Sequence, residues 1–329
     1  GSGAALAQFS DGTVPAWAGS LLVCLVVMVY VTYGGVRGTA WANTFQTLVF
    51  MTLGAVTFVW IVRELGGLTA ALDRVEASHP ELLVRGEAIP PLKLATYAFL
   101  PLSVGMFPHV FMHWLTAKSD RSFRLPMIAY PLCIAIVWVP SVLLGVLGRG
   151  AVDGLEGPAA NSILVVMIDR FAPGLLTGLL AAGVFAAIMS SLDSQTLSLG
   201  SMFTHDVVRR TRAGAALDEQ ALIRVGRVFV AAILGATWLL SLVADRKLFQ
   251  LGVWSFSGFA ALFPLVVGSL YWRRATRAGA LASVITVVVA WAAFLAHGWG
   301  VPGYTVGGTG IMPVAVMFVA GAAAFVGVS

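Results

Sequence analysis

Residues 174–202 read GLLTGLLAAGVFAAIMSSLDSQTLSLGSM, an apolar run longer than the ~20 residues that an α-helix needs to cross a hydrocarbon core of about 30 Å. Runs of similar character occur along the whole chain. They are Ala16–Tyr33, Asn43–Val62, Ala95–Ala117, Met127–Leu147, Gly174–Met202, Ile223–Val243, Phe249–Tyr271, Ala280–Ala296 and Gly310–Val328. The sequence therefore predicts an all-α membrane protein with about nine transmembrane helices.

The composition agrees with this prediction. Of the 329 residues, 59% are hydrophobic and 11% are charged, and the mean hydropathy is +0.90. A soluble domain is roughly 45–50% apolar and about 25% charged, so a soluble globular protein is excluded. The net charge of +5 does not indicate nucleic acid, because the Lys and Arg residues lie between the apolar runs. The predicted partner is the lipid bilayer. Cys24 and Cys133 each lie inside an apolar run, so we expect neither a disulfide nor a cysteine metal site.

Positive charge is distributed unevenly between the loops. Cytoplasmic loops of membrane proteins carry an excess of Lys and Arg. The largest group in short loops is Arg209, Arg210, Arg212, Arg224 and Arg227. We therefore predict that this set of alternate loops is cytoplasmic and that segment 63–94 is an external loop with a short helix. Residues 1–329 are expected to form a single transmembrane domain.

Three small residues inside run 174–202 share one helix face. Ser190 and Ser191 are adjacent, and Ala187 precedes Ser190 by three positions. Sodium prefers oxygen ligands, and two hydroxyls beside a backbone carbonyl supply about half of such a cage. The alternative is that the hydroxyls bond back to carbonyls of their own helix and only help helices pack.

Asp193 is a carboxylate well inside the same run. A charged side chain at that depth must be paired, protonated or bound to a cation. Ser194 is next to it and supplies a further hydroxyl. The alternative to a cation is an ion pair with Arg209 or Arg210, which lie about four turns further along or beyond the helix end.

Several stretches together resemble the sodium:solute symporter family, which carries sugars, proline, pantothenate and monocarboxylates. Residues 186–194, AAIMSSLDS, followed by Thr204-His205-Asp206-Val207, resemble the eighth core helix of that family. Residues 33–46 resemble the start of core helix five. Residues 105–113 and 270–280 resemble the broken core helix six and the end of core helix ten.

The resemblance implies an inverted-repeat (LeuT-like) transporter fold with substrate bound near mid-membrane. The predicted spans then correspond to core helices four to ten plus two peripheral helices, and the first repeat is incomplete. The chain begins Gly1-Ser2-Gly3 without an initiator Met, so we expect an excerpt of a longer protein. In the family, one sodium lies between core helices one and eight. The resemblance therefore implies Na+ as the coupling ion, with Ala187, Ser190 and Ser191 as its ligands on this chain.

The resemblance also implies a second cation site, with one departure. Family members that bind a second sodium often have Asp on core helix five, where this chain has Asn43. Here the carboxylate is on helix eight instead. The possible second cation ligands are therefore Asp193, Ser194 and Asn43.

The substrate candidates come from core helices six and ten. Gly105 and Pro108 interrupt a predicted span near its middle, and such breaks usually line a cavity. We expect Phe107 and His109 to contact substrate, although a proline kink can equally serve packing. On helix ten the candidates are Trp254 and Ser257, where an aromatic residue is also common in ordinary packing. His109 and His113 have zinc-ligand spacing, but no third ligand is evident, which argues against zinc.

These features predict sodium-coupled secondary active symport of a small organic solute by alternating access. The solute is expected to be an amino acid, carboxylate, sugar or vitamin, and the location is the cell membrane of a bacterium, as a multi-pass protein. An alternative is a symporter-like sensor domain attached to a histidine kinase. An enzyme is not expected, because no phosphate-binding loop, nucleophile elbow or HExxH motif is present. An intramembrane enzyme would need Ser190 or Ser191 to face His109.

Overall fold

The computed structural model describes residues 2–86, 89–152, 154, 157–243 and 248–329, and these residues are helical or irregular without a strand. The α-helices are α1 (Ser2–Phe9), α2 (Ala16–Glu64), α3 (Leu68–Ser78), α4 (Pro91–Tyr97), α5 (Pro108–Leu115), α6 (Arg124–Arg149), α7 (Ile163–Phe171), α8 (Gly174–Met202), α9 (Arg212–Ala215), α10 (Glu219–Val243), α11 (Leu248–Ala260), α12 (Phe263–Tyr271), α13 (Arg277–Gly298) and α14 (Pro313–Val328). Short 3₁₀ and π segments lie between several of them. The all-α prediction is confirmed.

Proline and threonine mark where several helices begin. Pro15, Pro90 and Pro173 directly precede α2, α4 and α8, where the missing N–H of proline costs nothing. Thr276 caps α13, because its hydroxyl accepts a hydrogen bond of 3.0 Å from the backbone N–H of Gly279. Pro131 lies inside α6, where neighbouring helices can compensate for the lost hydrogen bond.

Seven helices in the described part of the chain are long and apolar enough to cross a membrane: Ala16–Gly35, Arg37–Glu64, Asp120–Arg149, Thr177–Arg210, Glu219–Val243, Phe249–Tyr271 and Arg277–Gly298. The pair Pro91–Met106 and Pro108–Leu115 is bent by 52° and forms an eighth crossing if it is one span. The ninth expected span is present as α14, which at 16 residues is shorter than a straight crossing needs. Large apolar side chains are exposed on these helices, as on Leu125 (75%) and Leu270 (70%), which suits a surface covered by lipid.

By internal contacts the chain forms two compact units. Unit 1 comprises Gly1–Leu83 and Thr116–Arg246, and unit 2 comprises Val84–Leu115 and Lys247–Ser329. The prediction of a single transmembrane domain therefore stays a prediction.

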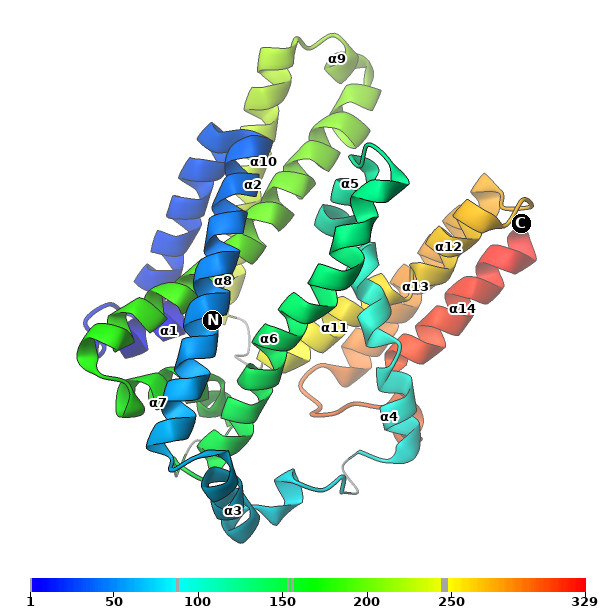
Figure 1. The fold of residues 1–329 in the computed structure, drawn as a ribbon. Coiled ribbons are helices and arrows are strands. Elements are labelled where there is room, and N and C mark those ends of the chain that lie inside the picture. The colour runs from blue at the N-terminus through cyan, green and yellow to red at the C-terminus, as the bar shows by residue number, and fades with distance from the viewer. Residues whose placement is uncertain (1, 87–88, 153, 155–156, 244–247) are drawn as a thin grey trace. The chain divides into compact units, whose positions relative to one another are not determined.

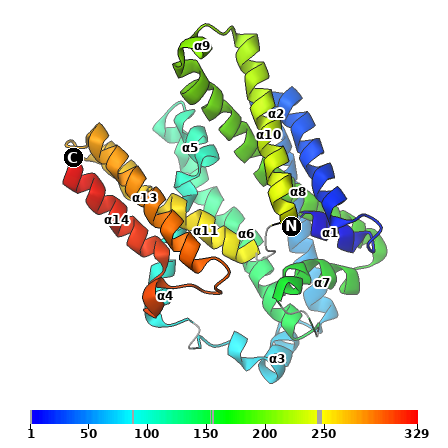
Figure 2. The same ribbon diagram turned by 180° about the vertical axis from the view of Figure 1, so that it is seen from behind.

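A single glycine folds α2 back on itself in unit 1. Gly35 has φ 55° and ψ −159°, a conformation that residues with a side chain rarely adopt. The two halves of α2 meet at this residue and run side by side away from it (Figure 1, Figure 2). The predicted runs Ala16–Tyr33 and Asn43–Val62 leave residues 34–42 between two spans, but residues 37–42 are helical. One left-handed residue is enough to reverse the chain, so the neighbouring polar residues can keep helical hydrogen bonds.

Two apolar clusters hold unit 1 together. The first joins the second half of α2 to α3, α6, α7 and α8, with Ile61, Val75 and Met167 fully buried. The second joins the first half of α2 to α10 and α8 through Val27, Val230 and their neighbours. Helix α8 contributes to both clusters, so its polar residues are carried on the central helix of the unit.

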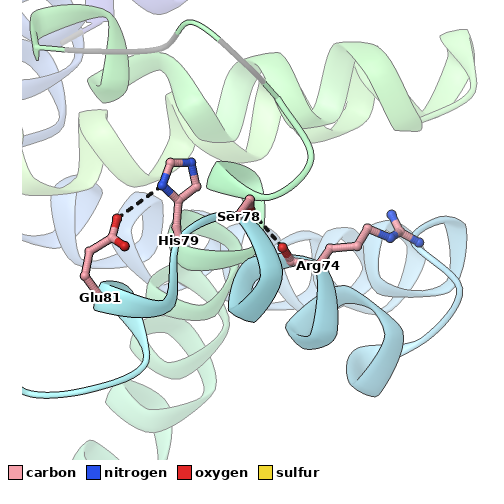
Figure 3. A network of polar contacts seen from close by, with 4 residues as sticks. All are labelled: Arg74, Ser78, His79 and Glu81. Atoms are coloured by element: carbon pink, nitrogen blue, oxygen red, sulfur yellow. Dashed lines mark hydrogen bonds and ion pairs between the residues drawn. The ribbon is translucent and has the colours of Figure 1, made fainter.

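The predicted loop 63–94 contains the expected short helix, α3, followed by a 3₁₀ turn, Pro80–Leu82. Near the end of α3 the hydroxyl of Ser78 donates to the carbonyl of Arg74 at 2.7 Å, and Nδ1 of His79 lies 3.1 Å from Oε1 of Glu81 (Figure 3). A backbone hydrogen bond to its carboxylate lowers the pKa of Glu81, and His79 lowers it further by a smaller amount. Residues 87 and 88 of this loop lie outside the described residues. The side of the membrane on which it lies stays a prediction.

Unit 2 contains the bent pair and helices α11 to α14. Helices α13 and α14 pack side by side (Figure 2). Buried Ala260 and Val314 join α11 and α14 to Leu100 in the 3₁₀ segment Leu100–Met106. The bend at 106–108 confirms that Gly105 and Pro108 interrupt this helix.

Candidate functional site

The predicted sodium ligands on α8 lie together. The hydroxyl of Ser190 donates to the carbonyl of Ala187 at 3.1 Å, and the hydroxyl of Ser191 approaches the same carbonyl at 3.5 Å. Ser190 is partly buried and Ser191 is exposed. Three oxygens are thus gathered on one helix face, and that face is accessible.

This local geometry fits both uses that the sequence allowed for these serines. A hydroxyl that donates to its own helix is the arrangement expected for packing. A donated proton leaves the hydroxyl lone pairs free, and a hydroxyl that turns away from the Ala187 carbonyl also frees a lone pair of that oxygen. The donor set is therefore suitable for a hard cation such as sodium, with the remaining ligands supplied from elsewhere.

Asp193 lies one turn further along α8, and its side chain is fully buried at 0% exposure. The hydroxyl of Tyr30, in the first half of α2, donates to Oδ2 of Asp193 at 2.8 Å. The two residues are 163 positions apart in the sequence. The hairpin at Gly35 places Tyr30 and residues of the second half of α2 against the same stretch of α8.

Asn43, in the second half of α2, contacts the same carboxylate. With its amide nitrogen facing Asp193, it donates to Oδ1 and Oδ2 at 3.0 and 3.1 Å, and its amide oxygen accepts from the hydroxyl of Ser194 at 2.5 Å. We assign this orientation because the reverse one would set the amide oxygen against the carboxylate. The three residues predicted as a second cation site are therefore brought together.

The alternative of an ion pair with arginine is not what the structure has. Among the described residues, Tyr30 and Asn43 donate to the carboxylate, and the hydroxyl oxygen of Ser194 lies 3.3 Å from its Oδ1. Arg210 instead approaches Asp206, at 3.8 Å. A buried carboxylate is thus surrounded by neutral hydrogen-bond donors, which stabilise its charge only in part.

Tyr30 was not predicted from the sequence. It lies near the end of the run Ala16–Tyr33, where an aromatic residue reads as an ordinary anchor at the membrane interface. The signal that could have found it is the pairing requirement of Asp193, since a buried carboxylate needs donors from facing helices. Sequence spacing does not say which helix faces it.

In unit 2, Phe107 sits at the break of the bent pair within an aromatic cluster. Its ring centroid lies 5.3 Å from that of Phe256 and 4.8 Å from that of Phe259, both on α11. The ring of His109 is 5.6 Å from that of Phe107. Phe107 and His109 are both partly buried. The two helix-six candidates therefore lie together, beside α11.

The helix-ten candidates are more deeply buried. Trp254 is 5% exposed, and its carbonyl accepts a hydrogen bond of 2.9 Å from the indole of Trp291. Ser257 is 1% exposed, and its hydroxyl donates to the carbonyl of Val253 at 2.7 Å. The contact of either residue with substrate stays a prediction.

The sequence matches the profile of the sodium:solute symporter family over residues 2–286. This match covers most of the chain and includes every stretch that resembled the family. The chain belongs to the sodium:solute symporter family. It is a multi-pass protein of the cell membrane.

Curated bacterial members of the family are similar over most of this chain. The sodium/pantothenate symporter of Escherichia coli (strain K12) is 27% identical over 290 residues, which cover 86% of this chain and 59% of that protein. The osmoregulated proline transporter OpuE of Bacillus subtilis (strain 168) is 26% identical, covering 81% of this chain and 55% of that protein. The sodium/proline symporter of Salmonella typhimurium is 26% identical, covering 90% and 60%. This chain thus spans less than two thirds of the length of these relatives.

The fold is also similar to that of a solved structure. A Na+-coupled sialic acid symporter, in its substrate-bound outward-open state, superposes with a TM-score of 0.71 at 17% identity. The superposition covers 98% of this chain and 70% of that one. At this identity the likeness shows the fold alone.

Proposed function

We propose that this protein is a sodium-coupled secondary active symporter that carries a small organic solute by alternating access. The observation that carries the proposal is the oxygen cluster of Ala187, Ser190 and Ser191 on α8 of a chain that belongs to a symporter family. The matching relatives are symporters, which favours transport over a sensor function or an enzyme.

The first sodium is proposed to bind at this cluster. The carbonyl of Ala187 and the hydroxyls of Ser190 and Ser191 would be ligands from α8. The exposure of Ser191 supports this proposal, because an ion must reach the oxygens and further ligands must approach them. A carbonyl and hydroxyls are neutral, so binding would be weak enough for release on the other side.

A second cation is proposed to bind at Asp193, Ser194 and Asn43. The support is a fully buried carboxylate without a basic partner among its contacts in the described residues. Asn43 can take part in two ways. Its nitrogen donates to the carboxylate when no cation is present, and rotation of the amide would turn its oxygen toward a bound cation. We propose that Tyr30 holds the carboxylate in the state without the cation.

The solute is proposed to carry a carboxylate. Proline, pantothenate and sialic acid, which the matching proteins transport or bind by name, all contain one. Phe107 and His109 at the helix break are the proposed substrate contacts. Trp254 and Ser257 are proposed as further contacts, because they lie on α11 close in sequence to Phe256, an aromatic partner of Phe107. An imidazole beside an aromatic surface is suited to a small organic acid.

Uptake by cells or vesicles that contain the full-length protein tests the proposal. Radiolabelled proline, pantothenate and sialic acid are each offered in sodium medium and in medium where choline replaces sodium. We expect at least one solute to accumulate in sodium medium only. Equal accumulation in the two media, for a solute that the protein carries, would contradict sodium coupling.

A further inference from the structure

Unit 1 contains a cavity that is lined by both apolar and charged side chains. It has a volume of about 630 Å³ and lies among the Gly34–Gly35 turn of α2, the end of α8 and the start of α10. It is therefore bounded by three helices of one compact unit. A phosphate ion alone needs much less space than this cavity offers.

The lining of the cavity combines apolar and charged side chains. Val31, Leu197, Leu222 and Val230 are among its apolar residues, and Val31, Leu197 and Val230 also belong to the apolar cluster that joins α2 to α10. Arg209, Glu219 and Arg227 are its charged residues. A ligand that fits must therefore be amphipathic, with an apolar part beside a charged part.

The charged side chains of the lining are mainly basic. Arg209 and Arg227 line the cavity, and Glu219 is the one carboxylate among the lining residues. Two arginines against one glutamate leave a net single positive charge, not counting His205. The guanidinium of Arg227 lies over the ring of Tyr33, with its carbon 5.9 Å from the ring centroid. This contact holds a cation beside the cavity.

Neither lining arginine is occupied by an acid. Among the residues that the structure describes, Arg209 and Arg227 form no ion pair, whereas neighbouring Arg210 pairs with Asp206 at 3.8 Å. Both side chains are exposed. Arginine guanidinium groups bind phosphate oxygens well, because their planar donors match two oxygens at once.

The cavity extends inward from the ends of three candidate membrane spans. The candidate spans Ala16–Gly35 and Thr177–Arg210 end at it, and the span Glu219–Val243 begins at it. Helix ends of this kind lie at the level of lipid headgroups. The predicted topology places these helix ends on the cytoplasmic side, where anionic lipids are found.

We infer that this cavity binds one anionic phospholipid, with its phosphate at Arg209 and Arg227 and part of an acyl chain along Val31 and Leu222. A single negative charge, as on phosphatidylglycerol, balances the net charge of the lining. The lipid would contact α2 on one side and α10 on the other, and so would tie the hairpin of α2 to α10. This inference does not depend on which solute or ion is transported.

The test is a lipid titration of the full-length protein in a neutral detergent, with bound lipids counted by native mass spectrometry. The probes are phosphatidylglycerol, phosphatidylcholine and inorganic phosphate. We expect one tightly bound phosphatidylglycerol, weaker phosphatidylcholine binding, and little displacement by inorganic phosphate. The double variant Arg209→Gln with Arg227→Gln should bind phosphatidylglycerol about thirty-fold more weakly, since each arginine near the surface contributes about 1 kcal/mol to anionic lipid binding.

The matched control is Arg212→Gln with Arg224→Gln. It removes the same charge from the same end of unit 1, but neither residue lines the cavity. We expect it to keep the tight site. A third variant, Gly34→Leu, fills the cavity without changing charge, since a Cβ atom added at Gly34 meets no atom within 4 Å. It should lose phosphatidylglycerol and phosphatidylcholine alike.

Three results would overturn the inference. Equal loss in the two arginine double variants would mean that general surface charge attracts the lipid. Equal affinity for phosphatidylglycerol and phosphatidylcholine would remove the role of the arginines. Displacement of the lipid by inorganic phosphate at comparable concentration would show that the site binds free phosphate. The arginine variants change only exposed side chains, so the two double variants can be compared even if Gly34→Leu does not fold.

Discussion

The hydroxyl of Tyr30 donates a 2.8 Å hydrogen bond to the carboxylate of Asp193, which links the first half of α2 to the centre of α8. Asn43 approaches the same carboxylate from the second half of α2. The buried charge is therefore enclosed by one helical hairpin and one helix. Gly35 does not contact Asp193, but the chain reversal at Gly35 positions Tyr30 and Asn43 beside that carboxylate.

Asp193 is the residue expected to contribute most to binding of the proposed second cation. Replacing Asp193 by Asn removes a charge whose attraction for a cation at ~4 Å is about 4 kcal/mol at an effective dielectric constant near 20, before desolvation is subtracted. We expect apparent sodium affinity in uptake to fall at least about tenfold, equivalent to about 1.4 kcal/mol. The control is Asp206→Asn, an exposed acid that pairs with Arg210. Unchanged sodium affinity in Asp193→Asn at matched expression would rule out the cation assignment.

Tyr30 is expected to stabilise the state without the cation. Tyr30→Phe keeps the ring and removes one donor from a buried carboxylate, which costs about 1–3 kcal/mol. In sodium-free buffer the purified variant should melt at a lower temperature than wild type. Added sodium should raise its melting temperature by more than it raises that of wild type, because the cation compensates the carboxylate. Tyr33→Phe is the control, since Tyr33 is 83% exposed. A smaller sodium-induced rise in Tyr30→Phe would indicate instead that the hydroxyl is a cation ligand.

Substitutions of Ser190 and Ser191 distinguish a sodium site from a role in helix packing. Ser191→Ala removes a proposed ligand from an exposed position, whereas Ser191→Thr retains a hydroxyl. We expect apparent sodium affinity to weaken about tenfold in the alanine variant, as for loss of roughly 1.4 kcal/mol, and to be mostly retained in the threonine variant. Ser190→Ala should behave like Ser191→Ala. Ser198→Ala, a buried serine two turns along the same helix, is the control. If the alanine variants change protein yield but not sodium affinity, the serines serve packing.

Gly35 is expected to be sensitive to any side chain. Its φ of 55° with ψ of −159° is strained for residues other than glycine, although a Cβ there would meet no atom within 4 Å. Gly35→Ala should therefore destabilise the protein by about 1–3 kcal/mol through the backbone alone. Gly34→Ala, one residue earlier and in helical conformation, should be close to neutral. Thermal unfolding of both variants in detergent measures the difference, and equal melting temperatures would argue against the hairpin.

The sequence by itself determined the elements of this protein and its family. Apolar runs and charged loops located the membrane helices, because the stability of a helix in the hydrocarbon core depends mainly on the hydropathy of its own residues. Gly105 and Pro108 predicted the bend in the third span, because proline removes a hydrogen bond inside any helix. The stretches around Ser190 and Asn43 identified the sodium:solute symporter family.

Only the tertiary structure decided which side chains meet. It paired Asp193 with Tyr30 and Asn43 rather than with Arg209 or Arg210, and it showed α2 helical on both sides of Gly35. The physical reason is that contacts between helices depend on the rotation and height of each helix in the bundle. Those quantities follow from packing over the whole unit, and a residue's place in its own helix does not contain them.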